Sequence, residues 1–163
     1  VTNVFANMSV WENLRCAVLW AAGYRYTFWK NIDNLPEVRE RTARILSDIN
    51  LTARRDVPAG LLTYAEQRAL EIGITVAGGA NVILLDEPTA GMSHAETERA
   101  VELIRRLTEG CTLLIVEHDM SVVFGLADRI SVLVYGQIIA SGTPEEIRGN
   151  PKVKEAYLGE EAA

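Results

Sequence analysis

The sequence predicts an α/β protein with a helical first half and a parallel sheet in its second half. Polar capping signals precede apolar segments in the first 80 residues, whereas short aliphatic runs rich in branched residues follow. The chain has 163 residues, 48% of them hydrophobic, enough for one sizeable core or two small ones. Both observations point to a globular α/β chain.

Two helices are expected near the start. Ser9 and Glu12 match a capping box, and the apolar stretch after them predicts a helix from Ser9 to Ala22. The aromatic segment 23–35 is expected to be a loop or a frayed helix end. Pro36 favours a first helical turn, and apolar or small residues at helical spacing predict a helix from Pro36 to Asn50.

A third helix begins at a similar signal. Thr63 and Glu66 again form a capping-box pattern, and the helix is expected to continue until Gly78 and Gly79 end it. An ordinary helix cap is one interpretation of this pattern.

Three aliphatic runs then predict strands: VILLD (82–86), TLLIVE (112–117) and ISVLVY (130–135). Their composition is typical of strands buried on both faces of a parallel sheet. A helix from Ser93 to Glu109, with Glu96 completing a capping box and Gly110 ending it, makes the first two runs a βαβ unit.

The remaining elements are short. A helix is expected over 120–127, an edge strand or hairpin partner over 137–141, and helical turns near Pro144 and Pro151. We therefore predict a helical subdomain over 1–80, a sheet-containing part over 81–143 and a helical tail over 144–163.

Charge and apolar content argue against several classes of protein, namely nucleic-acid-binding, membrane-spanning and secreted proteins. The net charge is −6 and the chain has only three lysines, which disfavours a nucleic-acid surface. The basic pairs Arg54-Arg55 and Arg105-Arg106 are expected to be solvated. No transmembrane helix or signal peptide is indicated, which predicts a cytoplasmic location.

The sequence offers no zinc site. Cys16 and Cys111 lie far apart, and only His94 and His118 could join them as soft ligands. Both cysteines are expected to be buried apolar residues.

Asp86 and Glu87 stand at the carboxyl end of the first predicted strand, where open parallel sheets bind ligands. One carboxylate could hold Mg²⁺ through its hydration shell, and the other could orient or deprotonate a water molecule. Solvated or helix-capping carboxylates are an equally good explanation of the dipeptide alone. His118 at the end of the next strand favours the functional interpretation.

Three motifs carry a family resemblance. VILLDEPTAGM (82–92) resembles the Walker B motif and D-loop of ATP-binding-cassette ATPases. Glu117-His118-Asp119 resembles their switch-histidine loop, and LTYAEQRALEI (62–72) resembles their signature motif. Order and spacing agree over essentially the whole chain, which implies a P-loop NTPase-like ABC ATPase core with a helical signature subdomain.

The resemblance implies a role for each matching position. Asp86 would hold Mg²⁺ through water, Glu87 would be the catalytic base and His118 would contact the γ-phosphate of ATP. The signature would contact the γ-phosphate of a nucleotide bound by a partner subunit, and Ser93 belongs to the D-loop. The signature residues implied to bind nucleotide are Thr63, Tyr64, Ala65, Glu66 and Gln67.

Three positions, in two motifs, depart from the family pattern. Tyr64 and Ala65 stand where the family usually has glycines, and Ala65 adds a methyl group where backbone approaches phosphate. Ser93 stands where aspartate is common, which leaves the role of the D-loop between subunits open.

A Walker A motif is absent from this sequence, because none of its lysines is followed by Ser or Thr. VTNVFANMSVWENL (1–14) resembles the segment just after the family's Q-loop glutamine. The expectation is a C-terminal fragment that is inactive alone. Because the Walker A strand would lie between the second and third predicted strands, we expect an interrupted sheet that self-associates or rearranges.

The tail, 142–161, is similar to that of ATPases for branched-chain amino-acid import, and lipopolysaccharide-export ATPases have a similar tail. The leading prediction is a transporter ATPase that pairs head-to-tail with a second ATPase subunit on the inner face of the plasma membrane. Its helical part would face permease subunits, with residues 24–29 at the surface or packed in the core. DNA-repair ATPases lack support, because no heptads and no basic surface are present. A non-catalytic interaction fragment is the third alternative.

Overall fold

The computed structural model describes residues 4–24 and 35–160 of the chain. Their contacts divide it into two compact units, one ending at Val116 and one beginning at Glu117. This division falls 36 residues after the sequence-based boundary at residue 80, because the first two strands belong to the first unit. The predicted segment 23–35, including the aromatic residues 25–29, lies almost entirely outside the described residues.

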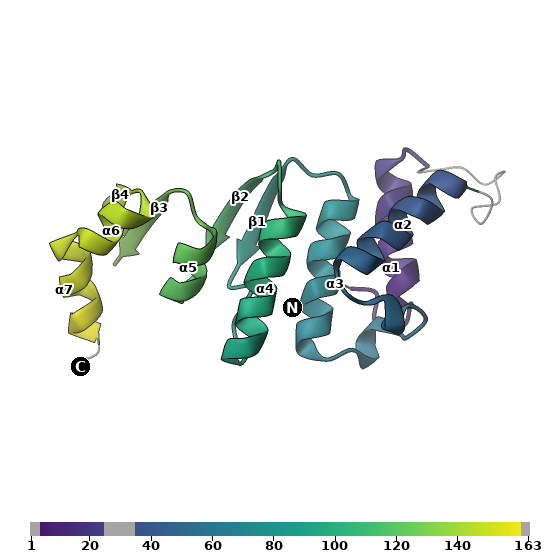
Figure 1. Cartoon of the computed structure of the whole chain (residues 1–163), viewed down its shortest axis with the longest axis horizontal. Helices are drawn as coiled ribbons and strands as arrows, with labels where there is room; N and C mark the ends of the chain where they lie inside the picture. The colour runs from purple at the N-terminus through teal and green to yellow at the C-terminus, as the bar shows by residue number, and fades with distance from the viewer. Residues whose placement is uncertain (1–3, 25–34, 161–163) are drawn as a thin grey trace. The chain divides into compact units, whose positions relative to one another are not determined.

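Three helices form the start of the first unit: α1 (Val10–Ala21), α2 (Pro36–Asp48) and α3 (Tyr64–Ala77) (Figure 1). Short 3₁₀ turns, η2 (Thr52–Arg54) and η3 (Ala59–Leu61), connect α2 to α3. The helices bury a shared apolar core, in which Leu14 and Leu70 are fully buried. The three predicted helices are confirmed to within two residues at each end.

Local capping explains where these helices begin. The Ser9 and Glu12 side chains form a reciprocal capping box at α1, and Pro36 occupies the first turn of α2. The buried amide of Asn13 ties the preceding loop to α1, because its oxygen accepts from the Phe5 N–H at 2.9 Å and its nitrogen donates to three backbone carbonyls. These bonds satisfy a polar group inside the core.

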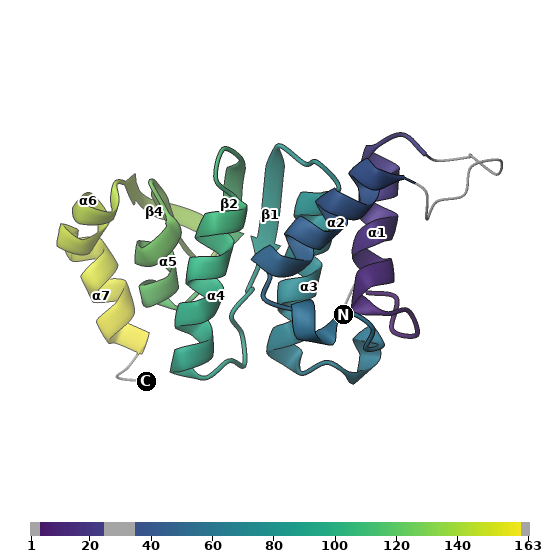
Figure 2. The same cartoon turned by 45° about the vertical axis from the view of Figure 1, so that its right-hand side comes forward.

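The strands β1 (Val82–Asp86) and β2 (Thr112–Val116) pair in parallel, with Leu84 opposite Leu114. Between them runs α4 (His94–Leu107), which lies beside this sheet in both views (Figure 2). Leu103 of α4 also joins the helical core. The predicted βαβ unit is therefore confirmed.

The prediction that these strands are buried on both faces is wrong. Ile83 is buried and Leu85 half-buried, whereas the alternate residues of both strands, Val82, Leu84, Leu114 and Val116, are exposed. Successive strand residues point to opposite faces, so one face of the β1–β2 sheet is uncovered by the described residues. Composition identified the strands, but it could not show what covers each face.

The second unit contains α5 (Met120–Leu126), a hairpin and two short helices. The hairpin strands β3 (Ile130–Val134) and β4 (Gln137–Gly142) are antiparallel, and both turn residues, Tyr135 and Gly136, have positive φ. This conformation matches the right-handed twist of the strands. The helices α6 (Pro144–Gly149) and α7 (Pro151–Glu160) follow, and Ile130, Ile147 and Val153 are buried together.

Among the described residues, the strands of the first unit form one two-stranded sheet and those of the second unit form another. None of the described helices combines the length and apolar character needed to cross a bilayer. Cys16 is exposed, which corrects the expectation that both cysteines are buried, and Cys111 is half-buried.

Candidate functional site: the α3 N-terminus and the carboxyl end of β1

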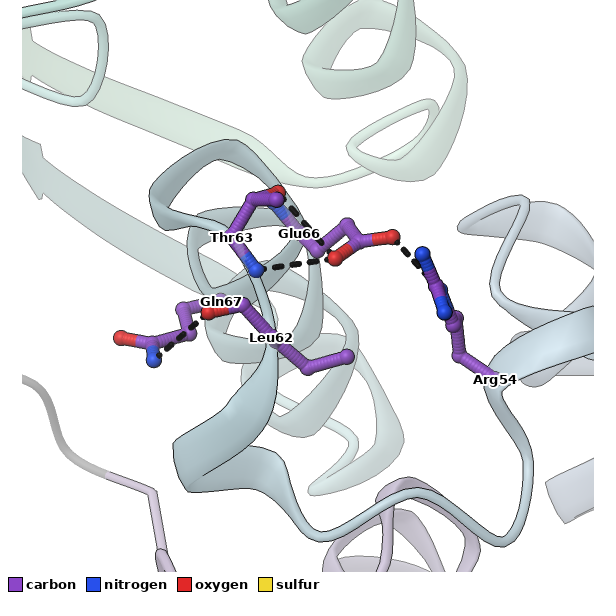
Figure 3. A network of polar contacts seen from close by, with 5 residues as sticks. All are labelled: Arg54, Leu62, Thr63, Glu66 and Gln67. Carbon is purple, nitrogen blue, oxygen red and sulfur yellow. Dashed lines mark hydrogen bonds and ion pairs between the residues drawn. The ribbon is translucent and has the colours of Figure 1, made fainter.

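The N-terminus of α3 is fixed by a network of hydrogen bonds (Figure 3). The Thr63 N–H donates to Oε2 of Glu66 at 2.9 Å, and the Thr63 hydroxyl donates to the same oxygen at 3.1 Å. In return the Glu66 N–H donates to the Thr63 hydroxyl oxygen at 3.3 Å. This is the capping box that the sequence predicts, and it coincides with the signature-like segment.

Gln67 holds the chain just before this cap. Its side-chain nitrogen donates to the Leu62 carbonyl at 3.2 Å and to the Ala59 carbonyl at 3.3 Å. Ala59 and Leu62 are buried in the helical core. Gln67 therefore connects the signature-like segment to a rigid part of the fold.

Arg54 completes the network from η2. Its Nε donates to Oε1 of Glu66 at 3.0 Å, although the arginine side chain is 53% exposed. Arg54 and Arg55 are both exposed, as predicted, but each also makes a contact, since Arg55 lies over the Trp11 ring, 4.2 Å from its centroid. Neither contact could be read from the sequence, because each joins segments at least 12 residues apart.

The Glu66 carboxyl has a pKa below its ordinary value. The first cause is the hydrogen bond from the Thr63 backbone, and the ion pair with Arg54 acts in the same direction, whereas partial burial opposes both. Each favourable contact stabilises the ionised form. Glu66 is thus a carboxylate whose two oxygens are both engaged.

Tyr64 and Ala65 form the first turn of α3 after the cap. The Tyr64 hydroxyl accepts from Nε of Arg68 at 3.1 Å, and Arg68 in turn donates to Glu71 at 2.8 Å. The aromatic ring is therefore held along α3, one turn from its own backbone. The Glu66 amide is bonded to the Thr63 hydroxyl, so the first-turn amides that α3 presents outward are those of Tyr64 and Ala65.

Asp86 and Glu87 lie together at the carboxyl end of β1, and both are exposed. The Glu87 N–H donates to the Val116 carbonyl at 2.9 Å, which extends the pairing with β2 by one residue. Glu87 itself has φ 43°, a left-handed conformation that is unfavourable for a residue with a side chain. The strand ends at Asp86, directly before this residue, and backbone outliers such as Glu87 occur preferentially at functional sites.

These carboxylates could provide part of the coordination of a Mg²⁺ ion. Mg²⁺ retains most of its water and takes few protein ligands, so a single exposed carboxylate such as Asp86 matches its chemistry. Within residues 4–24 and 35–160 no cluster of three or more metal-ligating side chains occurs. Asp86 could therefore contribute only part of the coordination.

Ser93 caps α4 at the end of the loop that follows β1. Its N–H donates to the Glu96 carboxylate at 2.9 Å and its hydroxyl at 2.6 Å. These two bonds lower the pKa of Glu96, with the hydroxyl bond the larger cause. In this structure Ser93 acts as a helix cap.

His118 belongs to the second unit. Its side chain is 74% exposed, and its backbone N–H donates to Oε2 of Glu117 at 3.2 Å. The Glu117 side chain is fully buried, a feature that sequence reasoning missed because a strand-terminal glutamate is normally solvated. Asp119 caps α5, and its bonds from the Ser121 hydroxyl and N–H lower its pKa.

The structure places these predicted residues at three positions along the chain. Thr63, Glu66 and Gln67 share the start of α3, while Asp86 and Glu87 share the end of β1. His118 is the second residue after the end of β2. The chemistry on offer is a helix N-terminus that can face an anion, and carboxylates that can serve a metal ion and a water molecule.

Fold comparison identifies the class of this architecture. The chain is similar to MJ1267, an ATP-binding cassette of an ABC transporter, with a TM-score of 0.72 and 27% identity over 93% of this chain and 63% of that chain. The fold is therefore a partial ABC ATPase fold.

Sequence comparison shows which ABC transporter ATP-binding proteins the chain resembles. Residues 137–163 match the family model described as branched-chain amino acid ATP-binding cassette transporter. The chain is 44% identical to the high-affinity branched-chain amino acid transport ATP-binding protein LivG of Salmonella typhimurium, over 76% of this chain and 49% of that protein. It resembles the ATP-binding subunits of branched-chain amino acid ABC transporters.

A more distant relative belongs to another transport process. The lipopolysaccharide export system ATP-binding protein LptB of Acidithiobacillus ferridurans is 35% identical over 77% of this chain and 52% of that protein. The chain spans about half the length of the curated relatives it matches here.

Proposed function

We propose that this chain supplies the signature and Walker B part of an ATP-hydrolysing subunit of an ABC transporter that imports branched-chain amino acids. The observation that carries the proposal is the placement of Asp86 and Glu87 at the carboxyl end of β1, with Glu87 held in a left-handed conformation beside β2. The 44% identity to LivG supports the choice of transporter group.

Each residue has a separate role in this proposal. The Asp86 carboxylate holds Mg²⁺ through water, and Glu87 accepts a proton from the attacking water. Mg²⁺ supplies charge neutralisation on the phosphates of ATP when both are bound. The exposed His118 imidazole contacts the γ-phosphate, and Ser93 belongs to the contact between subunits.

The signature residues act on a nucleotide held by another subunit. Thr63 caps α3, and the first-turn amides of Tyr64 and Ala65 that follow it present hydrogen-bond donors and the positive end of the helix dipole to a phosphate. Tyr64, Ala65, Glu66 and Gln67 shape this surface. The phosphate-binding loop for the same reaction is not among these 163 residues, so the chain by itself is expected to bind ATP weakly.

The partners follow from the same arrangement. A second ATPase subunit, identical or related, pairs head-to-tail with the signature segment, and membrane permease subunits contact the helical part. This places the protein at the inner face of the plasma membrane, with no role for nucleic acid.

The test replaces Glu87 with Gln in the complete ATPase that contains this chain. Glu87→Gln keeps the shape of the side chain but removes its ability to take a proton, so ATP binding persists while turnover falls by about a thousandfold or more. Glu98→Gln, on the exposed face of α4, is the matched control. Unchanged turnover in Glu87→Gln would refute the assigned role.

An exporter of the LptB type is the alternative that a specific observation supports, since this chain is 35% identical to that protein. Stimulation of ATP turnover by permease subunits distinguishes the two. Stimulation by a branched-chain amino acid permease supports import, and stimulation by a lipopolysaccharide-export permease supports export. If ATP turnover is absent in the complete protein, a non-catalytic interaction role remains.

A further inference from the structure

Arg54 and Glu66 join two segments that are separated in the sequence. Oε1 of Glu66 accepts from Arg54, while Oε2 accepts from both the N–H and the hydroxyl of Thr63 (Figure 3). One carboxylate thus spans from η2 to the start of α3. Its two oxygens have different partners, and together they determine the plane of the carboxylate.

The backbone of Arg54 is itself anchored. Its N–H donates to the Leu51 carbonyl at 2.9 Å, and its own carbonyl accepts from the Val57 N–H at 3.0 Å. Leu51 is buried in the helical core. The guanidinium therefore starts from a fixed backbone position, although its end is partly exposed.

Arg54 gives Glu66 a second anchor in addition to Thr63. A glutamate has three rotatable side-chain bonds, and an exposed one loses substantial rotamer freedom when it is held in one geometry. The capping box fixes Oε2 on Thr63, but the Arg54 bond fixes the remaining oxygen. Without Arg54, the carboxylate can rotate away from Thr63, and the Thr63 hydroxyl can turn with it.

We propose that Arg54 is a positioning residue of the signature segment, which holds Glu66 on Thr63 and thereby sets the direction of the Thr63 hydroxyl and the first-turn amides of α3. The inference rests on the proposed function, because the ligand of this segment is there taken to be a nucleotide phosphate. Arg54 acts through Glu66 rather than as a charge that attracts the phosphate directly.

A double-mutant cycle on the complete ATPase separates these two modes of action. Arg54→Ala raises KM for ATP about fivefold when Glu66 is present, and less than about twofold in the Glu66→Ala background, because contacting residues couple. Arg54→Lys restores most of the loss, since a cation can still bond the carboxylate. Equal effects of Arg54→Ala in both backgrounds indicate a direct charge effect and overturn the proposal.

Measurements on the chain itself test the same link without turnover. By NMR, Arg54→Ala raises the pKa of the Glu66 carboxyl and speeds amide hydrogen exchange at Thr63 several-fold. Arg44→Ala is the matched control, because it removes an exposed arginine from α2 and leaves both values unchanged. Unchanged Glu66 titration and Thr63 exchange in Arg54→Ala also overturn the proposal.

The two proposals fail in distinguishable ways. Absence of ATP turnover in the unmodified complete protein contradicts the proposed function, while the NMR measurements still decide whether Arg54 positions Glu66. If turnover is normal and the effects of Arg54→Ala and Glu66→Ala are additive, the proposed function stands and the positioning role of Arg54 is contradicted. Thermal melting of each variant separates loss of folding from loss of positioning.

Discussion

The helical core and the β1–β2 sheet differ in how completely each covers its own apolar surface. Leu14 and Leu70 of the helical core are fully buried, whereas Leu84 and Leu114 of the sheet are 69% and 57% exposed. Each helix has one apolar stripe, and two neighbouring helices suffice to cover it. A strand has two faces, and α4 lies beside only one side of this sheet. The helical core is thus self-sufficient, but the sheet depends on a further covering layer.

The largest contrast is expected in stability. Leu14→Ala removes buried methyl groups and leaves a cavity, which lowers the free energy of unfolding by about 3 kcal/mol. Leu84→Ala changes it by less than about 0.5 kcal/mol, because the side chain is already exposed. Urea unfolding of both variants, followed by circular dichroism, checks the difference. Equal losses would mean that the exposed face is covered in solution.

The second expected effect concerns self-association of the chain. One face of the β1–β2 sheet is exposed, and β2 pairs only with β1 among the described strands. We therefore expect the chain to self-associate, so that its apparent mass in analytical ultracentrifugation rises with concentration. Leu84→Asp combined with Leu114→Asp weakens association about tenfold or more, because charge is placed on that apolar face.

The control for this experiment uses an equally apolar side chain elsewhere. Leu61 of η3 is exposed and does not belong to the sheet, so Leu61→Asp leaves the association unchanged. A chain that stays monomeric at high concentration contradicts the prediction. If Leu61→Asp alone disperses the chain, the contact surface is on the helical region instead.

A smaller effect is expected at the α3 cap, where the helical core meets the candidate site. Thr63→Ala removes the side-chain cap and lowers the free energy of unfolding by about 1 kcal/mol, whereas Thr63→Ser keeps the hydroxyl and loses little. Thermal denaturation of the two variants measures the difference. No difference between them would show that the hydroxyl does not cap α3.

The same cap makes stability depend on pH. Because the pKa of Glu66 is lower in the folded chain, its stabilisation is fully present above the unfolded pKa of glutamate and is lost as pH falls through the folded pKa. Glu66→Gln should therefore flatten the pH dependence of unfolding in this acid range. Urea titrations at several acidic pH values measure it, and an unchanged slope contradicts this account.

Local patterns predict much of the fold correctly. The four-residue pattern that begins at Ser9, Thr63 and Ser93 predicts three helix starts, and each is observed as a cap. The motifs around Asp86 and His118 are short and contiguous, so the sequence alone carries the family resemblance. The assigned roles of the site residues, including Glu87, remain predictions.

Other features could not be predicted from the sequence, because they involve contacts between segments that are far apart in it. Glu87 combines a left-handed backbone with a bond to Val116, 29 residues later, and Glu66 accepts a bond from Arg54, 12 residues earlier. Burial is wrongly predicted for Cys16 and for one face of the strands, because hydrophobic composition does not reveal what packs against a residue.

The sequence by itself determined where the helices begin, which segments are strands and which family the motifs resemble, because those signals lie within a few consecutive residues. Only the tertiary structure decided which face of β1–β2 is uncovered, how Glu87 ends its strand and what holds Glu66 in place. These properties arise from pairing and packing between distant segments, and their energies depend on which surfaces meet rather than on the local order of residues.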